Sequence, residues 1–404
     1  MAPKSIKTAY IVGAGFSKYA GLPLTAGFTD AMLAARGFGG GPSKLIVDYV
    51  SRFIRETFNH STKAKADKWP DLEDIFTCVD LAANSGHHLG STFKPADLRT
   101  VRRAILSRII RMLDQSYEKG RRKKGTDWFT LDTFFGTLDL SQVGFISMNW
   151  DNVVERKLQM RLGGPLIDYN CDASPVAIPD LPNEDDFDSP LRFLRVLKKY
   201  NGTIQLGKPL SDDDKKKCVP LIKIHGSINW LYCDNCRRLF WCHPDQVPRI
   251  ANQLITADDL DRMEHVLGKS AAKKQATISK LRQTPPVLCF CSDGVALGAR
   301  IATFSYRKAL EFPMFQKSWF AAEELLREAE EWVFIGYSLP AADFEFKYLL
   351  KRTQLSRKTP PLIKLVTGGN TKSALMTLRN YRRFFGRDIK TANFYSKGFA
   401  SFLS

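Results

Sequence analysis

The sequence lacks any run of about 18 apolar residues, which is the length that a membrane-spanning helix needs. Its first residues are polar and carry no apolar stretch of the kind found in secretory signals. Cysteine is sparse, with eight in 404 residues, and neither internal repeats nor long low-complexity tracts occur. These absences exclude a helical membrane protein and a secreted domain built on disulfides. We therefore expect a cytoplasmic protein with no membrane partner.

Negative charge is scarce relative to positive charge. The chain has 60 Lys and Arg residues against 42 Asp and Glu residues, which gives a net charge of +18. Such an excess favours an anionic partner: a phosphorylated ligand, an acidic protein surface or nucleic acid. Part of it is concentrated in the basic run 119–124. We expect this run to be a solvated loop; nucleic-acid contact is the alternative, although no nucleic-acid-binding module accompanies it.

Short β-branched and apolar runs recur along the chain, and each ends in glycine or a polar residue. This pattern is typical of buried parallel strands, and the stretches between them have helical periodicity. It predicts a Rossmann-like, doubly wound α/β sheet, which binds ligands beyond the carboxyl ends of its strands. The predicted strands are 8–12, 143–147, 219–224, 332–335 and 362–366, and the loops that follow them are 13–25, 149–151, 225–227, 336–343 and 367–370.

Two segments interrupt this pattern. Residues 43–117 have helical periodicity, so we expect a helical insertion over 40–130 that the basic run 119–124 closes. Residues 233–295 hold two cysteine pairs around a basic helical stretch, so we expect a small Cys-containing, zinc-ribbon-like module. The remaining ranges, 1–39, 131–232 and 296–404, are then assigned to the Rossmann-like catalytic domain.

The first loop contains Gly13, Ala14 and Gly15, directly after the first predicted strand. Glycines at this point let backbone amides approach a diphosphate, and the following helix adds positive potential at its N-terminus. Ser17 could donate a further hydrogen bond. The spacing departs from the Rossmann pattern because Lys18 stands where a third glycine is usual. An ordinary turn between a strand and a helix is the alternative.

Polar residues with catalytic chemistry follow two other strands. Asn149 could orient a water molecule or a ribose, and Asp151 could hold a hydroxyl group or a neighbouring loop. His225 is suited to removing a proton from water or a ribose hydroxyl near neutral pH. The alternatives are structural: a helix cap at Asp151 or Asn152, and a histidine that only packs.

Four of the eight cysteines are clustered. Two pairs of this kind could supply four thiolates to a structural Zn²⁺, a closed tetrahedral site without a free position. The second pair is C-x-C, and Cys242 with His243 is a rival source of ligands. A ribbon that folds without metal is the alternative. The clustered residues are Cys233, Cys236, Cys289 and Cys291.

Taken together, these motifs resemble the sirtuin superfamily, and more specifically the prokaryotic sirtuin-like NADases of antiphage defence. Residues 13–23 are similar to the sirtuin loop Gly-Ala-Gly-x-Ser-x-x-Ala-Gly-x-Pro, and residues 225–227 to the sirtuin His-Gly motif that precedes a zinc module. Residues 147–151 look like Thr-x-Asn-Tyr-Asp of the defence branch. The segments 69–76, 336–343 and 398–403 are also typical of that branch.

The resemblance implies a substrate and a set of roles. NAD⁺ would be cleaved to nicotinamide and ADP-ribose, which would deplete NAD⁺ in antiphage defence by abortive infection. Asn149, His225 and Asp151 would be catalytic. NAD⁺ would be bound by Gly13, Ala14, Gly15, Ser17, Thr25, Gly336, Ser338 and Asp343.

Two departures from the deacylases bear on the substrate. The strand that pairs with an acyl-lysine peptide has no counterpart after Cys291, and the helical insertion is absent from the compact deacylases. Both departures disfavour a peptide substrate, and an NAD-dependent protein deacylase is one alternative. A nucleic-acid-acting or assembly subunit with minor NADase activity is the other, because of the basic charge.

Control of the activity is expected to lie outside the chain. Family members of this kind often carry a long C-terminal sensor, whereas this sequence ends at Ser404, about where the catalytic domain should end. We therefore expect a homo-oligomer or a partner chain, and the resemblance suggests a HerA-type hexameric ATPase.

Overall fold

The computed structural model describes residues 6–35, 41–58, 69–162, 167–178, 204–207, 210–268, 287–291, 295–301, 313–368, 371–386 and 389–404. A large parallel sheet has the strand order β14-β13-β12-β1-β2-β6-β3. Each predicted strand is present, and the bounds differ by a single residue at two of them. The strands are β1 Thr8–Val12, β2 Val143–Ser147, β3 Ile167–Asp168, β6 Val219–Lys223, β12 Glu331–Ile335, β13 Leu362–Val366 and β14 Phe394–Tyr395.

The strand order has a switch point between β1 and β12. The chain forms β2 beside β1 and β3 at the edge, and later inserts β6 between β2 and β3; it then returns to the other side of β1 to add β12, β13 and β14. All of these pairings are parallel. Loops that leave two neighbouring strands in opposite directions open a crevice at the sheet edge, where doubly wound folds bind ligands.

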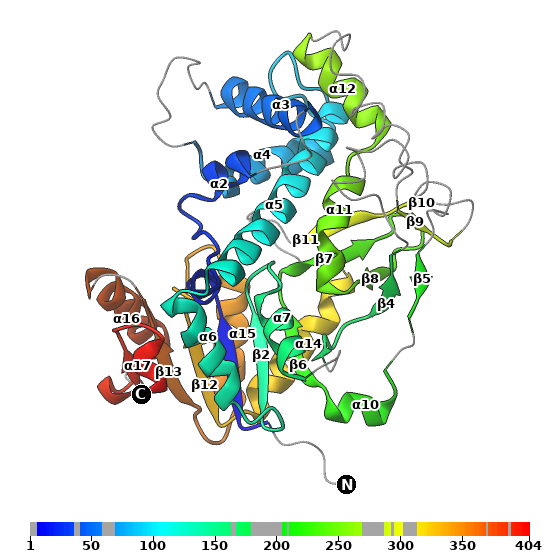
Figure 1. Ribbon diagram of the computed structural model, residues 1–404. Helices are drawn as coiled ribbons and strands as arrows, with labels where there is room; N and C mark the ends of the chain where they lie inside the picture. The colour runs from blue at the N-terminus through cyan, green and yellow to red at the C-terminus, as the bar shows by residue number, and fades with distance from the viewer. Residues whose placement is uncertain are drawn as a thin grey trace.

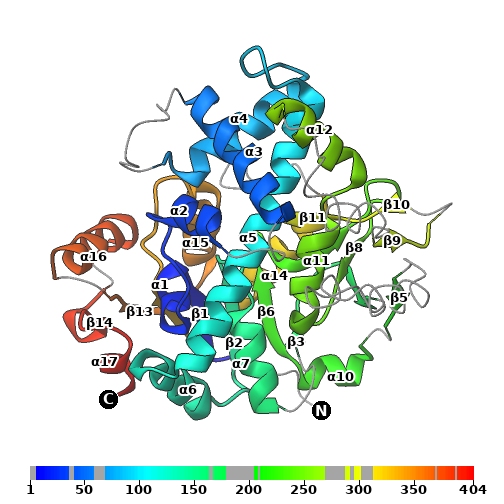
Figure 2. The same cartoon turned by 45° about the horizontal axis from the view of Figure 1, so that its top comes forward.

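Helices cover both faces of this sheet because its central strands are apolar on both sides. Helices α6 (Thr126–Thr137) and α7 (Val153–Leu162) lie on one face, and α14 (Pro313–Glu328) and α15 (Phe344–Ser356) lie on the other (Figures 1 and 2). On the first face Phe134 packs edge-on against Tyr10, with ring centroids 5.1 Å apart. On the second, Leu325 lies against Gly144, where a Cβ would come within 2.6 Å of its methyl group.

The helical part is built around one long helix, α5 (Pro95–Lys123). Helices α3 (Gly41–Thr57) and α4 (Leu72–Ser85) pack against it, and so does α2 (Phe28–Ala34). Two helices from the range assigned to the Cys-containing module, α11 (Val247–Gln253) and α12 (Ala257–Leu267), also pack against α5. The domain ranges stay a prediction, but these contacts group 247–267 with the helical part (Figure 1).

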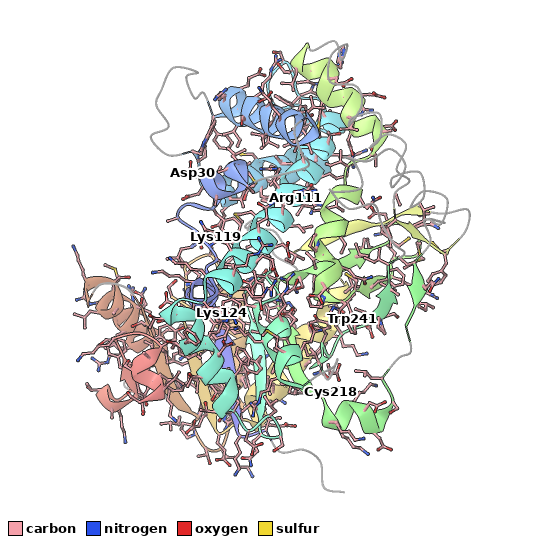
Figure 3. The ribbon with its side chains drawn as sticks, in the orientation of Figure 1. Asp30, Arg111, Lys119, Lys124, Cys218 and Trp241 are labelled. Atoms are coloured by element: carbon pink, nitrogen blue, oxygen red, sulfur yellow. The ribbon has the colours of Figure 1, made fainter. Side chains whose placement is uncertain are left out.

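The basic run 119–124 does not form the expected loop. It makes the last turn of α5, with Arg121, Arg122 and Lys123 inside the helix and Lys124 as the left-handed residue that ends it. Figure 3 labels Lys119 and Lys124 at this end of the helix. Basic side chains are favourable here because the carbonyl end of a helix carries partial negative charge.

A second sheet follows the first, and Cys233 and Cys236 lie in its turn between β7 and β8. Its order is β11-β7-β8-β4-β5, and β9 and β10 form a separate hairpin. These strands and the shorter helical elements complete the predicted α/β class with a helical part and a small Cys-containing part. They are β4 Ala173–Ala177, β5 Gln205–Leu206, β7 Gly226–Tyr232, β8 Leu239–Trp241, β9 Leu288–Cys289, β10 Val295–Ala296, β11 Gly298–Ile301, α1 Ala14–Ser17, η1 Lys18–Ala20, α10 Asp212–Lys217, η2 Pro244–Gln246, α16 Thr371–Phe385, η3 Thr391–Asn393 and α17 Ala400–Leu403.

Candidate functional site

A cavity of about 360 Å³ lies at the carboxyl ends of the parallel strands, at the switch point. Loops that follow β1, β2, β6 and β12 line it, together with Phe28, Glu73 and Leu113 from the helical part. Sequence reasoning missed these three, because no local pattern shows which face of a helix meets a sheet edge. Of the predicted site residues, the cavity brings together Gly13, Ala14, Ser17, Thr25, Asn149, Asp151, His225, Gly336, Ser338 and Asp343.

The glycines of the first loop allow close packing within the protein. A Cβ on Gly13 would lie 2.7 Å from the carbonyl oxygen of Gly336, and a Cβ on Gly15 would lie 2.7 Å from the Gly336 Cα. The amide of Gly15 donates to Gly336 O at 2.9 Å, and that of Gly13 donates to Ile335 O at 3.1 Å. Close packing of two strand-end loops therefore requires these glycines, and both amides are used within the protein.

Asn149 is held in one orientation by the loop after β1. Its Nδ2 donates to Gly13 O and to Ser17 Oγ, both at 2.8 Å. An amide nitrogen has two hydrogens and the amide oxygen is the only acceptor, so these two bonds fix which end is which. With Nδ2 turned toward the loop, Oδ1 is the acceptor that Asn149 offers to the cavity.

Asp151 extends the same chain of hydrogen bonds. Ser17 Oγ donates to its Oδ2 at 2.7 Å, and the amide of Val153 donates to its Oδ1 at 3.0 Å. The second bond is a cap on the start of α7, which is the structural alternative, and the same residue also lines the cavity. Burial raises the pKa of Asp151, and the charge of Lys223 and the bonds from Ser17 and Val153 act to lower it.

His225 sits at the corner where the chain passes from the first sheet into the second. Gly226 makes this corner with φ +75°, a conformation that favours glycine. His225 Nδ1 lies 3.1 Å from Met148 O. Since a carbonyl only accepts, Nδ1 carries the proton, and in the neutral ring Nε2 is the basic nitrogen.

The loop after β12 brings a carboxylate toward this histidine. Nε2 of His225 lies 3.9 Å from Oδ1 of Asp343. The hydroxyl of Tyr337 donates to Oδ2 of Asp343 at 2.8 Å, and Tyr381 in turn donates to Tyr337 O at 2.8 Å. Burial and the charge of Asp343 raise the pKa of Tyr337 well above its ordinary value, so it stays a donor. The histidine therefore faces a carboxylate that two buried tyrosines hold in place.

A second cavity, of about 440 Å³, adjoins the first. Gly15 lines this second cavity, and Thr367 and Gly368 from the loop after β13 reach it as well. Thr367 is buried, and its hydroxyl has no hydrogen-bond partner within the described part of the chain. The predicted loops thus divide between two neighbouring cavities, which share Ala14, Thr25, Gly336, Tyr337 and Ser338.

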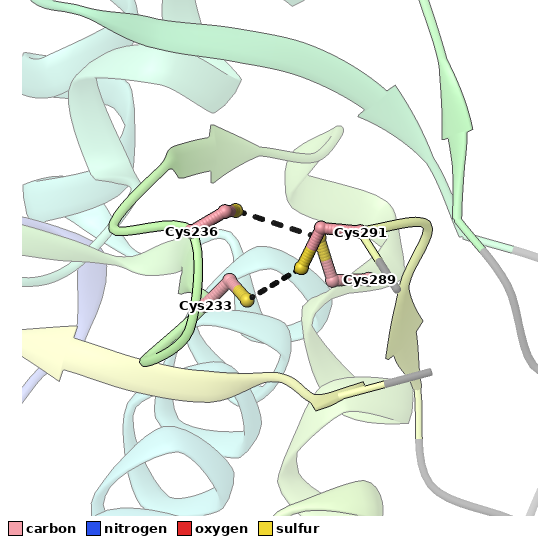
Figure 4. A group of neighbouring side chains, drawn as sticks. All are labelled: Cys233, Cys236, Cys289 and Cys291. Atoms are coloured by element: carbon pink, nitrogen blue, oxygen red, sulfur yellow. Dashed lines mark hydrogen bonds between the residues drawn. The ribbon is translucent and has the colours of Figure 1, made fainter. Parts of the chain in front are cut away.

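The four clustered cysteines meet in space, two from each pair (Figure 4). Cys233 Sγ lies 3.5 Å from Cys291 Sγ, and Cys236 Sγ lies 3.8 Å from Cys289 Sγ. All four sulfur atoms lie within 4.8 Å of one another. A tetrahedral Zn²⁺ with bonds of about 2.3 Å places its sulfurs ~3.8 Å apart, so the group fits this ion.

The rival ligand pair lies elsewhere. The Sγ of Cys242 donates to the carbonyl oxygen of Asn229, inside the second sheet, and His243 contacts Asp245. Within the described residues, neither joins the four-cysteine group.

Among the helices that the structure describes, none is long and apolar enough to cross a membrane.

Comparisons with known proteins give structural neighbours only. No protein-family model and no curated protein matches the sequence. Solved structures that match include Sir2 with the inhibitor EX-527, 2′-O-acetyl-ADP-ribose and a deacetylated p53 peptide (13% identical, TM-score 0.31), Sir2 with a p53 peptide and NAD⁺ (13%, 0.30), and Sir2 bound to an acetylated peptide (11%, 0.32). Each match covers 99% of this chain, and 92%, 91% and 91% of the respective neighbour. Because these TM-scores are low, the fold is assigned from the strand order of this chain alone.

Proposed function

We propose that this chain binds NAD⁺ and hydrolyses the bond between its nicotinamide and ribose, releasing nicotinamide and ADP-ribose. The observation that carries the proposal is the convergence of two groups on one cavity. Asn149 offers an oriented amide oxygen, and His225 offers a basic Nε2. An acceptor and a general base at the switch point of a doubly wound sheet suit the attack of water on a ribose carbon.

The paired cavities suit a dinucleotide. One half of the ligand occupies the cavity with Asn149 and His225, and the adenosine half occupies the neighbour beside Thr367. The pyrophosphate then crosses the shared wall near Ala14 and Ser338. Because the amides of Gly13 and Gly15 are already used, its oxygens depend on other donors of these loops and on the positive net charge.

In the proposed reaction, the bond between C1′ and the nicotinamide nitrogen breaks, and its electron pair neutralises the pyridinium ring. Asn149 Oδ1 accepts a hydrogen bond from the water that attacks C1′, and His225 Nε2 takes its proton. Asp343, 3.9 Å from Nε2, stabilises the imidazolium that results. The proton then leaves to solvent, so water and NAD⁺ give nicotinamide, ADP-ribose and H⁺.

The helical part argues against a peptide substrate. Phe28, Glu73 and Leu113 come from α2, α4 and α5, and they line the same cavity as the strand-end loops. A deacylase must leave this space to an acyl-lysine side chain. Incubation with NAD⁺ and an acetyl-lysine peptide separates the two activities, since a deacylase forms one O-acetyl-ADP-ribose for each nicotinamide.

The decisive experiment measures NAD⁺ loss and product formation by chromatography for the wild type, Asn149→Ala, His225→Ala and the control His87→Ala. His87 is exposed and does not line the cavity. Nicotinamide and ADP-ribose from the wild type and the control, with at least ~100-fold less from the other two, is the expected outcome. Unchanged turnover in either cavity variant would refute the assigned roles.

The biological role extends this proposal through the sequence resemblance. The reaction depletes NAD⁺ in the cytoplasm as an antiphage defence that aborts infection. Its control lies in a homo-oligomer or in a partner such as a HerA-type hexameric ATPase. Phe344, Tyr348 and Leu355 leave apolar surface exposed along α15, which supports an assembled form. Light scattering of the purified chain tests this, and a fully active monomer would contradict it.

A further inference from the structure

A fully buried ion pair lies directly behind the loop that carries Asn149 and Asp151. Lys223 Nζ is 3.2 Å from Oε1 of Glu155, and both side chains are 0% exposed. The same ammonium group donates to the backbone carbonyl of Asp151. A buried lysine costs free energy unless its charge and hydrogen bonds are satisfied, and replacing a buried pair with apolar residues is often neutral or stabilising. Core stability alone therefore does not account for a charge at this position.

The ion pair belongs to a set of contacts made by residues on both sides of His225. Residues 223, 225 and 227 alternate along the chain, and all three reach the segment between β2 and α7. Lys223 contacts Asp151 O, His225 Nδ1 contacts Met148 O, and Ser227 Oγ donates to Trp150 O at 3.3 Å. The histidine is thus fixed against the loop by a contact on either side of it.

Glu155 connects several of the residues that make these contacts. Its Oε1 accepts from Asn152 Nδ2 at 3.0 Å and from Tyr169 OH at 3.4 Å, besides facing Lys223. Asn152 Nδ2 also lies 3.0 Å from Ser227 Oγ. The carboxylate therefore connects the start of α7 with the strand that follows His225.

We propose that Lys223 and Glu155 are positioning residues that set the separation of Asn149 from His225. This inference rests on the proposed NAD⁺ hydrolysis. The pair pulls the carbonyl of Asp151 toward the end of β6, and thereby fixes the loop on which Asn149 stands relative to the corner that carries His225. Neither side chain lines the cavity, so neither touches the substrate.

Four variants test the proposal: Lys223→Met, Glu155→Gln, the double variant Lys223→Met/Glu155→Met, and the control Lys157→Met. Lys157 lies on α7, the helix that carries Glu155. It is also buried, and it pairs with Asp132 away from the cavity. Both single changes at the pair should lower kcat on the order of 100-fold, because small misplacements of reacting groups have effects of this size. The control should lose thermal stability and keep its kcat.

The double variant separates positioning from stability. Replacing both charges should restore most of the Tm lost in Lys223→Met, whereas kcat should stay low. If the pair serves only the core, kcat returns together with Tm, and the proposal is wrong. Wild-type kcat in either single variant would also overturn it, since the backbone bond from Ile228 N to Trp150 O would then suffice.

A readout without turnover keeps this inference distinct from the proposed reaction. Hydrogen exchange followed by mass spectrometry should show faster exchange at residues 148–154 in Lys223→Met and Glu155→Gln than in Lys157→Met. Equal exchange in all of them would overturn the positioning role. A wild type that holds the loop in this way but turns over no NAD⁺ would instead count against the proposed function alone.

Discussion

Ser17 is the joint between Asn149 and Asp151, so we expect Ser17→Ala to disturb both. The hydroxyl accepts from Asn149 Nδ2 at 2.8 Å and donates to Asp151 Oδ2 at 2.7 Å. Losing a hydrogen bond to a buried charged group costs about 1.5–3 kcal/mol, and the missing oxygen leaves little empty volume. The free energy of unfolding should fall by that amount. Since Asn149 keeps its bond to Gly13, kcat should fall by a factor of about 10 rather than to zero.

Ser17→Ala should also change how kcat and stability depend on pH, and the pKa of Asp151 sets the direction of the change. The Ser17 bond lowers the pKa of Asp151 against the effect of burial, so its loss raises that pKa further. Other groups facing the carboxylate, namely Lys223, Glu155 and the Val153 amide, are unchanged. If ionised Asp151 supports the loop, the acid limb of kcat moves to higher pH. Between the pKa of Asp151 in the unfolded chain and its higher pKa in the folded chain, the native state binds more protons than the unfolded state. The free energy of unfolding therefore falls as pH rises through this window, and Ser17→Ala extends the window to higher pH.

The assay is a pH profile of NAD⁺ hydrolysis together with urea unfolding at several pH values. Ser107→Ala is the matched control, because Ser107 is buried and donates to Ala251 O at 2.6 Å far from the cavity. The control should lose stability with an unchanged profile. Wild-type kcat and an unmoved acid limb in Ser17→Ala would show that the bond chain does not serve the reaction.

Three further substitutions probe the metal group, the loop packing and the carboxylate beside the histidine. Cys291→Ser should reduce bound zinc from about one per chain and lower the Tm, as measured by metal analysis and thermal unfolding; full zinc content in the variant would exclude it as a ligand. Gly336→Ala should destabilise by more than ~2 kcal/mol, because its φ is +62° and a Cβ would lie 2.3 Å from Phe16 N, whereas Gly136→Ala has open space in α6 and should not. Tyr337→Phe removes the donor to Asp343 and should lower kcat about tenfold; an unchanged kcat would mean that this carboxylate does not act on the histidine.

The sequence was sufficient for the parts of the site that depend on strand ends. Apolar runs such as Thr8–Val12 and Leu362–Val366 are self-contained, so their bounds agree with the structure. Because parallel strands end at one edge of a sheet, residues that follow different strands, such as Asn149 and His225, were expected to meet. Their arrival at one cavity needed no knowledge of side-chain contacts.

What the sequence could not provide is contact between distant segments. The helices at 247–267 have an ordinary amphipathic pattern, which does not reveal that their partner is α5 rather than the nearby cysteines. The packing role of Gly13 was missed for the same reason, since Gly336 follows it by more than 300 residues. A signal for the ion pair was present, because Lys223 interrupts an otherwise apolar strand, but its partner Glu155 is recognisable only in the folded chain.

Strand β7 connects the four-cysteine group with the cavity. Strand β7 begins at Gly226, beside His225, and ends at Tyr232, beside Cys233. Seven residues of strand span about 23 Å, so the four-cysteine group lies at one end of β7 and the polar contacts of Ser227 lie at the other. If the cysteines hold zinc, we expect its loss to loosen the far end of β7 first, because bonds such as Ile228 N to Trp150 O and Asn229 Nδ2 to Cys242 O hold the strand near His225. In the proposed reaction the cysteines are therefore remote from the chemistry, whereas the ion pair behind Asp151 contacts the loop that carries Asn149.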